Sequence, residues 1–441
     1  MPIKYLPVRG KTVYSFGGGA NEVQVLSSND ATNYWVDLGG GDDIAVLGAG
    51  GDTIIGGKGS DTISGGQGDD TIYGGIDGSL SARNGESDVL SGDASAGQVN
   101  GGYVFGEDTI YGAVGSSLFQ SHIFGDNTGG VGGALQCGDD DLWGGSGFNY
   151  IYGDAYYLFA GAIGGNDWLR LSGGSSNDVL HGDARFLNGT GARGGDDHIE
   201  LSHVVGQGQA FGDAEDMQGG GFGGDDYLEG SGNSGAVSLL WGDAYYINTP
   251  DYSGPTTVVA GNDILVAQGG QTEMMGDATY VNFVFDYQGG TVVFGDDMLD
   301  ASGAASGSFT TMYGDSVYIT ARSGSTITCG DDTLKAGVGE DDMWGDYSQL
   351  TDEGGVVTRG ADNFIFSGLA KGGNDIIYDF QLGTDSIMFS DFSGTLVFTD
   401  IDYFEDGGND STVITIDGDS SWSLLVIGVP GLTSGDITFT A

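Results

Sequence analysis

The sequence predicts an all-β solenoid, in which short strands joined by tight turns coil around one apolar core. Three observations predict it. Within residues 38–75, four aspartates lie nine residues apart, at Asp43, Asp52, Asp61 and Asp70. A large apolar residue follows each of the last three by two positions. Glycine makes up 89 of the 441 residues, against only 5 prolines, so turns are frequent. A fixed short period of this kind is typical of repeat architectures.

The repeating unit reads G-G-x-G-x-D-x-U-x, where U is a large apolar residue. Its three glycines permit sharp turns that expose backbone carbonyls. The x-U-x segment is long enough for a three-residue strand that turns its apolar side chain to one face. Carboxylates and carbonyls are the hard oxygen ligands that Ca²⁺ takes in sets of six to eight. No single unit supplies that many.

This pattern resembles the haemolysin-type calcium-binding nonapeptide of RTX proteins. The resemblance implies a right-handed parallel β-roll in which two nonapeptides make one coil of about 18 residues. Asp52 would then stack on Asp70, and Asp43 on Asp61. Each of several calcium ions would be shared between successive turns along one edge of the roll.

The charge of the chain agrees with this cofactor. The formal net charge is −51, from 63 acidic and 12 basic side chains. Such a chain repels itself unless cations bind, and about 25 divalent ions would neutralise it. Because no basic patch exists, we expect no nucleic-acid partner and no binding to anionic membranes. The alternative is a general acidic surface, which the fixed phase of the aspartates argues against.

Beyond residue 91 the coil is predicted to continue with insertions. Gly-Asp-Ala or a close variant recurs nine times from Gly92 to Gly345, and each copy is followed by G-x-D after a variable stretch. Against a regular nonapeptide these stretches are 9–16 residues longer, always in the same turn. The insertions should therefore stack in a row along one edge. Alternating polar and apolar residues around glycine turns, as in 277–295 and 315–330, predict hairpins.

The aspartates at the repeat phase are the predicted calcium ligands. In the turn opposite the insertions, aspartate occupies only three of nine equivalent positions after residue 75, so calcium is predicted to concentrate on the insertion edge. Two roles stay open for the Gly-Asp-Ala aspartates, a calcium ligand or a cap that bonds a turn amide. The predicted ligands are Asp43, Asp52, Asp61, Asp70, Asp88, Asp108, Asp140, Asp167, Asp178, Asp197, Asp226, Asp263, Asp297, Asp332, Asp341, Asp362 and Asp375.

The chain divides into three predicted segments. Residues 1–37 form an N-terminal β cap that covers the open end of the solenoid. Residues 38–366 form the calcium-binding roll, regular over 38–91 and with insertions over 92–366. Residues 367–441 form a C-terminal β cap and resemble the secretion signal of RTX proteins exported by a type I system. The N-terminus lacks the apolar core of a Sec signal peptide, and no run of 18 apolar residues predicts membrane insertion.

Other motifs are few. Cys137 and Cys329 are predicted to be free, buried thiols, because the coils that carry them lie too far apart for a disulfide. There is no H-E-x-x-H, no G-x-S-x-G and no Walker motif, and the sequence identifies no catalytic residue. The insertion tyrosines are predicted to pack insertion against insertion, with stacking on sugar rings as the alternative. These are Tyr156, Tyr157, Tyr245, Tyr246, Tyr252 and Tyr280.

The leading functional prediction is a secreted, calcium-binding, non-enzymatic structural protein of the bacterial cell surface or extracellular matrix. Nearly the whole chain is repeat, with no separate effector domain ahead of it. Stacking of copies into fibres or layers is the expected assembly mode, and folding should depend on calcium. The alternative is a polysaccharide-active glycanase or lyase whose site lies in the insertion row.

Overall fold

The computed structural model describes residues 3–6, 13–25, 30–75, 87–94, 98–100, 103–113, 120–171, 177–249, 256–283, 289–367, 373–392, 394–404 and 410–440. Two compact units, residues 1–217 with 221–224 and residues 218–220 with 225–441, are described separately below. Strands dominate both, and η2 (Ser434–Asp436) is a single short 3-10 turn. Within the described ranges no helix is long and apolar enough to cross a membrane. The predicted all-β fold is confirmed.

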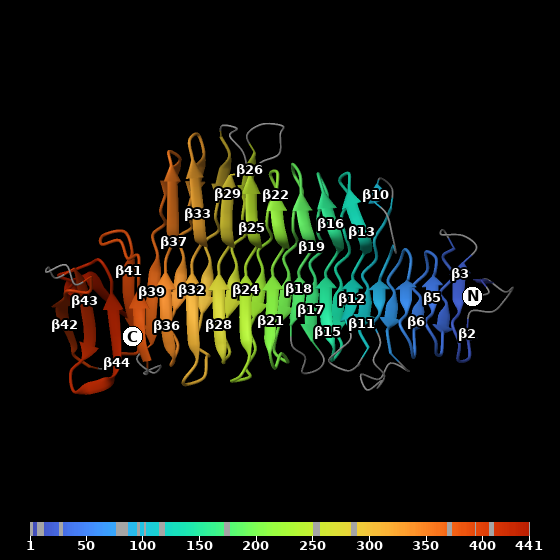
Figure 1. The fold of residues 1–441 in the computed structure, drawn as a ribbon, viewed down its shortest axis with the longest axis horizontal. Helices are drawn as coiled ribbons and strands as arrows, with labels where there is room; N and C mark the ends of the chain where they lie inside the picture. Colours follow the sequence, from blue (N-terminus) through green and yellow to red (C-terminus); the bar gives the residue numbers. More distant parts are fainter. Residues whose placement is uncertain are drawn as a thin grey trace. The chain divides into compact units, whose positions relative to one another are not determined.

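In unit 1 the chain winds between two parallel sheets, as Figure 1 shows for the blue-to-green part of the ribbon. The first roll sheet contains β1 (Ile3–Leu6), β3 (Glu22–Val25), β5 (Ile44–Val46), β7 (Thr62–Ser64), β9 (Val89–Ser91), β12 (Gln120–Phe124), β15 (Phe148–Tyr152), β18 (Asp178–His181) and β21 (Gln207–Phe211). The second roll sheet contains β2 (Val13–Ser15), β4 (Trp35–Asp37), β6 (Thr53–Ile55), β8 (Thr71–Tyr73), β11 (Thr109–Tyr111), β14 (Asp141–Gly144), β17 (Trp168–Leu171) and β20 (His198–Glu200).

The core of the roll is made by the apolar residue of each x-U-x strand. Ile54 pairs in register with Ile72, and Ile72 pairs with Ile110. All three side chains are fully buried. Because side chains alternate between the two faces of a strand, a three-residue strand buries its middle residue and leaves the flanking ones outside. Full burial of such a side chain stabilises the fold by roughly 1.5–3 kcal/mol.

The insertions of unit 1 form a third parallel sheet, here called the insertion sheet. Neighbouring insertions pair directly, for example Leu158 with Leu187. The predicted row of stacked insertions is therefore confirmed for this unit (Figure 1). Its strands are β10 (Gln98–Asn100), β13 (Asn127–Gly132), β16 (Ala155–Phe159), β19 (Ala184–Asn188) and β22 (Ala214–Gln218).

Unit 2 repeats this plan and adds a second insertion sheet. Its first roll sheet contains β24 (Val237–Trp241), β28 (Gln271–Met275), β32 (Phe309–Tyr313), β36 (Glu340–Trp344) and β40 (Gly373–Ile377). Its second roll sheet contains β23 (Tyr227–Glu229), β27 (Ile264–Val266), β31 (Met298–Asp300), β35 (Thr333–Lys335), β39 (Asn363–Ser367), β41 (Ser386–Ser390) and β45 (Ile437–Thr440). Its insertion sheets contain β25 (Ala244–Thr249), β29 (Ala278–Phe283), β33 (Ser316–Arg322) and β37 (Tyr347–Glu353), and β26 (Thr257–Val259), β30 (Thr291–Val293), β34 (Thr326–Thr328) and β38 (Val356–Thr358).

The predicted antiparallel hairpins within the insertions are wrong. Among the described residues, β29 pairs in parallel with β25 and β33, and β30 pairs in parallel with β26 and β34. The apolar residues of the alternating pattern do face a core, since Val281 and Val292 are fully buried. However, the backbone partners come from neighbouring coils. A stacked neighbour of similar sequence satisfies every amide in register, which leaves no need for pairing within one insertion.

The last part of unit 2 is antiparallel. β42 (Leu396–Ile401) pairs with β43 (Ser411–Ile416), and β43 pairs with β44 (Asp419–Val426). β44 in turn pairs in parallel with β40 of the roll. This three-stranded end therefore continues the first roll sheet of unit 2 and reverses its strand direction.

Aromatic rings follow the same stacking. Tyr152 lies between Phe124 and His181, with ring centroids 4.8 and 4.9 Å apart. In unit 2, Tyr280 stacks on Tyr318 at 4.9 Å. Similar contacts involve Tyr156, Tyr157, Tyr245 and Tyr246, whereas Tyr252 lies outside the described residues. The rings thus contact one another between insertions, as the packing prediction expected.

Candidate metal centre

The predicted calcium ligands on the insertion edge lie in one line within each unit. Each aspartate accepts a hydrogen bond from the backbone amide of its counterpart one coil earlier. The amides of Asp52, Asp70 and Asp108 each donate to the Oδ1 atom of the next aspartate over 2.6 Å. In unit 2 the same bond joins Asp263 to Asp297 over 2.7 Å. The stacking of Asp52 on Asp70, expected from the family resemblance, is therefore confirmed.

The second carboxylate oxygen of these residues is buried and has no hydrogen-bond partner in the protein. A buried carboxylate oxygen without a partner is costly, since transfer of a charge out of water must be compensated. A row of such oxygens therefore indicates that cations are part of the folded state. The oxygens are the Oδ2 atoms of Asp52, Asp70, Asp108, Asp140, Asp167, Asp263, Asp297, Asp332 and Asp362.

From Asp70 onward, a glycine lies directly beside each of these oxygens and leaves a small space, here called the cradle. A Cβ atom placed on Gly153 would collide with Oδ2 of Asp167 and with the carbonyl oxygen of Gly182. Only glycine fits there, which explains the glycine that precedes each aspartate of the Gly-Asp-Ala motif. The cradle is lined by carboxylate and carbonyl oxygens, the ligand types that Ca²⁺ requires. The residues present therefore fit calcium.

Burial makes these carboxylates hard to ionise in the absence of a cation. Burial raises the pKa of Asp52 to about 7. Burial and the charge of Asp108 raise the pKa of Asp70 to about 10. A divalent ion would reverse this effect, because a bound cation is the largest local charge in a site.

The open question about the Gly-Asp-Ala aspartates has a geometric answer. Oδ1 of Asp154 accepts the amide of Gly165 over 3.1 Å, and Oδ1 of Asp183 accepts the amide of Gly195 over 2.9 Å. Each aspartate thus joins the beginning and the end of its own insertion by a hydrogen bond. Their Oδ2 atoms are buried without a partner. One oxygen caps the turn while the other is left for a ligand role, so the two alternatives do not exclude each other.

The opposite edge differs in the groups that line its turns. At Asn149 the side-chain amide donates to the carbonyls of Gly145 and Gly147, each over 3.0 Å, and to Oδ1 of Asp178 over 2.8 Å. The NH₂ group satisfies the oxygens that a cation would otherwise bind. The first turns of this edge do keep aspartates in line, since the amide of Asp43 donates to Oδ1 of Asp61 over 2.8 Å.

One predicted ligand on this edge is engaged by protein donors. Oδ1 of Asp375 accepts the amide of Asp341 over 3.3 Å, and its Oδ2 accepts the indole of Trp422 over 2.8 Å. Trp422 lies on β44, far along the chain, and no sequence pattern links it to the repeat. Asp88, at the start of β9, accepts the amide of Asp61 over 3.0 Å and continues this line in unit 1.

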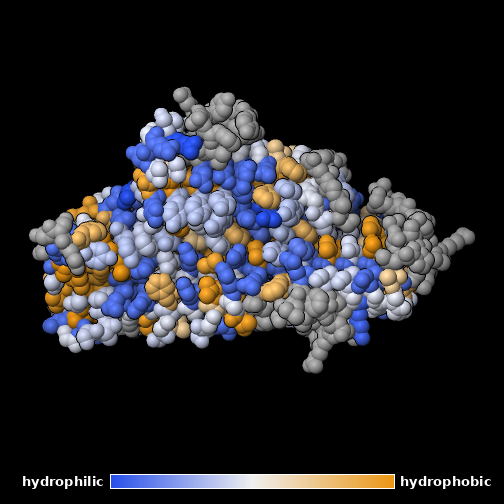
Figure 2. Space-filling view, viewed as in Figure 1, coloured by the Kyte–Doolittle hydropathy of each residue, from blue (hydrophilic) through white to orange (hydrophobic). Residues whose placement is uncertain are grey.

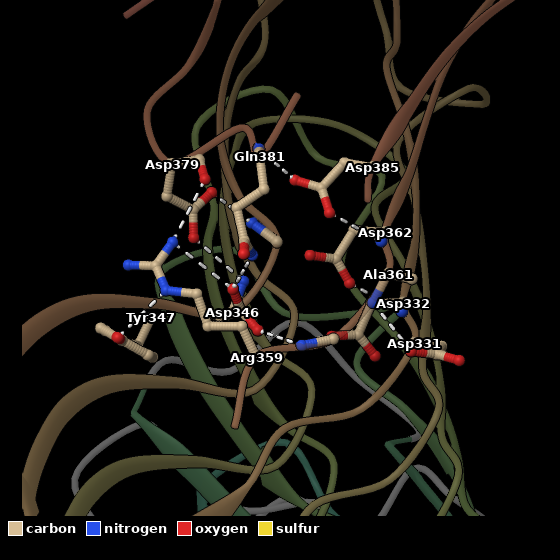
Figure 3. Close-up of polar contacts among 12 residues, drawn as sticks. Asp331, Asp332, Asp346, Tyr347, Arg359, Ala361, Asp362, Asp379, Gln381 and Asp385 are labelled. Carbon is tan, nitrogen blue, oxygen red and sulfur yellow. Dashed lines mark hydrogen bonds and ion pairs between the residues drawn. The ribbon is translucent and has the colours of Figure 1, made fainter. Parts of the chain in front are cut away.

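Asp385 and Asp379, which the sequence did not predict as ligands, lie at the ends of the aspartate lines of unit 2 (Figure 3). Asp385 accepts the amide of Asp362 over 3.2 Å and the amide of Gln381 over 2.6 Å. Asp379 accepts the amides of Gly345 and Asp346 over 2.8 and 3.1 Å. Asp385 keeps the repeat phase, because Gly383–Ile387 reads G-x-D-x-U and Ile387 pairs with Phe364. Asp379 lies outside that phase, and no sequence pattern marked it.

The thiols lie as predicted, and one imidazole is buried in the core. Cys137 and Cys329 are both free and buried. His181 is buried in the ring stack of the first roll sheet, and burial lowers its pKa to about 3. It is therefore neutral at physiological pH and has no exposed face for catalysis.

A family model for the RTX calcium-binding nonapeptide repeat matches four stretches, residues 46–78, 138–155, 164–184 and 330–346. No match was found among curated proteins or among solved structures. The four stretches lie on the turns and strands that hold the aspartate lines in both units. Repeats of this family bind calcium ions in several turns, and proteins that carry them are typically secreted. The chain therefore carries RTX calcium-binding nonapeptide repeats in four matched stretches.

Proposed function

We propose that the protein is a secreted structural component of the cell surface or extracellular matrix, without enzymatic activity, whose roll folds when calcium binds. The observation that carries this proposal is the line of buried, unpartnered carboxylate oxygens on the insertion edge. Without cations, their mutual repulsion and desolvation oppose folding. When calcium binds, these carboxylate oxygens coordinate the ions and so link one coil to the next.

The C-terminal end of unit 2 supports self-assembly. Large apolar side chains are exposed there: Val397 is 40% exposed, Phe404 60% and Phe439 49%. Figure 2 shows the corresponding apolar surface over the β42–β44 end of the unit. β42 also has β43 as its only partner strand among the described pairings. An edge strand with apolar neighbours is a template for pairing with another chain.

We further assign the ligands and the export signal. The repeat-phase aspartates predicted from the sequence hold the calcium ions, chiefly on the insertion edge. Residues 367–441 act as the C-terminal β cap and as the uncleaved signal for a type I exporter. Low calcium inside the cell then keeps the chain extended for export, and extracellular calcium at millimolar levels folds it outside.

The polysaccharide-active alternative has less support. The insertion tyrosines stack on neighbouring rings, which occupies the faces that a sugar ring would need. The convergent carboxylates at the base of the insertions, such as Asp154 and Asp183, are fully buried. Neither group presents a reactive atom to a bulky polymer substrate.

Two measurements test the proposal. Circular dichroism should show a β signal in calcium that collapses in excess EGTA and returns when calcium is restored, and a signal insensitive to EGTA would refute calcium-coupled folding. Electron microscopy of the purified chain in calcium should show fibres or layers. Dispersed monomers at all concentrations, together with release of reducing sugar from bacterial exopolysaccharide, would replace the structural role with the enzymatic one.

A further inference from the structure

One position of the insertion turn lies between two successive Gly-Asp-Ala aspartates. It is the residue directly before each G-x-D. A Cβ atom placed on Gly164 would meet Oδ2 of Asp154 at 2.9 Å and would collide with Oδ1 of Asp183. At Gly194, one coil later, it would meet Oδ2 of Asp183 at 2.6 Å. At these two glycines the position therefore faces two buried carboxylates.

The chain itself places a cation at this position in one coil. Arg359 precedes Gly360 in the same register, and its Nη1 atom lies 3.7 Å from Oδ2 of Asp346. Its Nε atom donates to the hydroxyl of Tyr347 over 3.1 Å, and Nη1 donates to the carbonyl of Asp379 over 3.3 Å. Figure 3 shows the guanidinium directed at these partners. The surroundings of this position thus favour positive charge.

In two coils the same position carries a thiol. The sulfur of Cys137 and one carboxylate oxygen each from Asp126 and Asp154 all lie within 4.8 Å of one another. The same arrangement is formed in unit 2, where the thiol lies between two further Gly-Asp-type aspartates. All four aspartates are fully buried, and the thiols are 5% and 7% exposed. The second cluster is Asp315, Cys329 and Asp346.

The second cluster also contains an oxygen that needs a partner. Oδ1 of Asp315 accepts the amide of Gly330 over 2.8 Å, whereas its Oδ2 is buried and has no hydrogen-bond partner. In the first cluster Asp126 takes the place of Asp315, and its two oxygens accept the amide of Gly138 over 3.4 and 3.2 Å. The unpartnered buried oxygen of that cluster is Oδ2 of Asp154, which also faces Gly164 of the next coil. A thiol, two carboxylates and an unsatisfied buried oxygen form a donor set rather than an apolar packing contact.

We propose that these two clusters, Asp126–Cys137–Asp154 and Asp315–Cys329–Asp346, each bind one thiophilic divalent cation of the zinc class, separate from the calcium lines. Thiolate sulfur and carboxylate oxygen are both zinc ligands, whereas Ca²⁺ takes oxygen ligands alone. Three ligands are the number that zinc takes from a protein when a fourth position is left to water or another oxygen. Because the ligating thiol and carboxylates must be deprotonated, each site releases the thiol proton, together with any proton held by its two carboxylates, as the metal–sulfur bond forms.

The register explains why only two coils would have this specificity. Where the position is glycine, as at Gly164, only carboxylate and carbonyl oxygens line the space, which suits calcium. Where it is Arg359, the guanidinium replaces the ion. Where it is cysteine, sulfur completes a mixed donor set. In three further coils the position is apolar, at Phe105, Ala260 and Phe294, so only the two cysteine coils combine sulfur with carboxylate oxygens.

Cadmium is the probe for the test, because it binds in place of zinc and its bond to thiolate gives an ultraviolet charge-transfer absorption. The full chain is unfolded in urea and refolded in excess calcium with added Cd²⁺, since the clusters are closed to solvent in the folded state. We expect two Cd²⁺ per chain with the thiolate band, displaced by Zn²⁺. Cys137→Ala and Cys329→Ala should each lose one ion and half of the band.

The bound calcium is counted in the same samples, so a failure of calcium-coupled folding is seen separately. If a cysteine variant does not recover the β signal, the wild-type chain still decides the question through its thiols. Cadmium should slow their alkylation during refolding, and magnesium at the same concentration should not. A wild-type chain without the thiolate band, or a double variant that keeps both Cd²⁺ ions, would overturn the proposal.

Discussion

A methyl group added at Gly276 should remove calcium from the roll. Its Cβ atom would collide with the carbonyl oxygen of Gly314 and with Oδ2 of Asp297, the two oxygens that line one cradle. Overpacking of this kind costs about 1–3 kcal/mol. Loss of the ion leaves buried carboxylate charge uncompensated, which costs roughly 3–5 kcal/mol more. The variant Gly276→Ala should therefore bind at least one calcium ion fewer and unfold at a clearly lower urea concentration.

The matched control is Gly235→Ala in the same unit. A Cβ atom on Gly235 has no heavy atom within 4 Å, and its backbone has no positive φ angle. Its stability should change by less than about 0.5 kcal/mol, as for other surface substitutions. Bound calcium is counted after equilibrium dialysis, and unfolding is followed by circular dichroism in calcium. If Gly276→Ala retains the calcium count and urea midpoint of the control, the cradle is not an ion site.

Three further changes test other parts of the metal lines. Asp167→Asn removes one ligand charge and should weaken calcium binding roughly tenfold or more, the equivalent of about 1.5–3 kcal/mol for a charged hydrogen-bonding group; Asp139→Asn, an exposed neighbour, should leave the calcium titration unchanged. Asn149→Asp removes the amide that satisfies the opposite turn, and it should add one calcium ion at saturation, so an unchanged count would contradict that role. In EGTA, burial raises the pKa of Asp52 to about 7 in the folded chain, so this carboxyl keeps its proton up to about pH 7. In the unfolded chain the same carboxyl loses its proton above about pH 4. The calcium-free roll should therefore be most stable below about pH 4 and lose stability as the pH rises through 7. A β signal in EGTA that grows with pH would contradict this.

The nonapeptide repeat could be recognised in the sequence because the spacing of the repeats along the chain matches the stacking of the coils in the structure. Asp52 and Ile54 recur after one coil as Asp70 and Ile72, and the two pairs stack in register. In a solenoid each residue contacts its repeat counterpart, so a local pattern determines long-range contacts. The insertion row followed from the same phase.

The partners of the insertions were decided by tertiary structure. A segment such as 277–295 alternates in the way that both a hairpin strand and a stacked parallel strand require. Only the presence of a similar insertion in the next coil selects the parallel pairing of β29 with β33. The end of the line at Asp375 likewise depends on Trp422, which the fold brings there from β44.

By itself, therefore, the sequence determined the coil, its apolar core and the line of repeat-phase aspartates. The tertiary structure decided which other side chains lie beside each line of aspartates. It placed Cys137 and Cys329 each between two buried carboxylates and directed Arg359 at Asp346 and at the backbone carbonyl of Asp379. The physical reason is that these contacts join neighbouring coils across insertions of unequal length. The repeat marks the position of these residues, directly before each G-x-D, but the partners that they meet come from neighbouring coils at unequal distances along the chain.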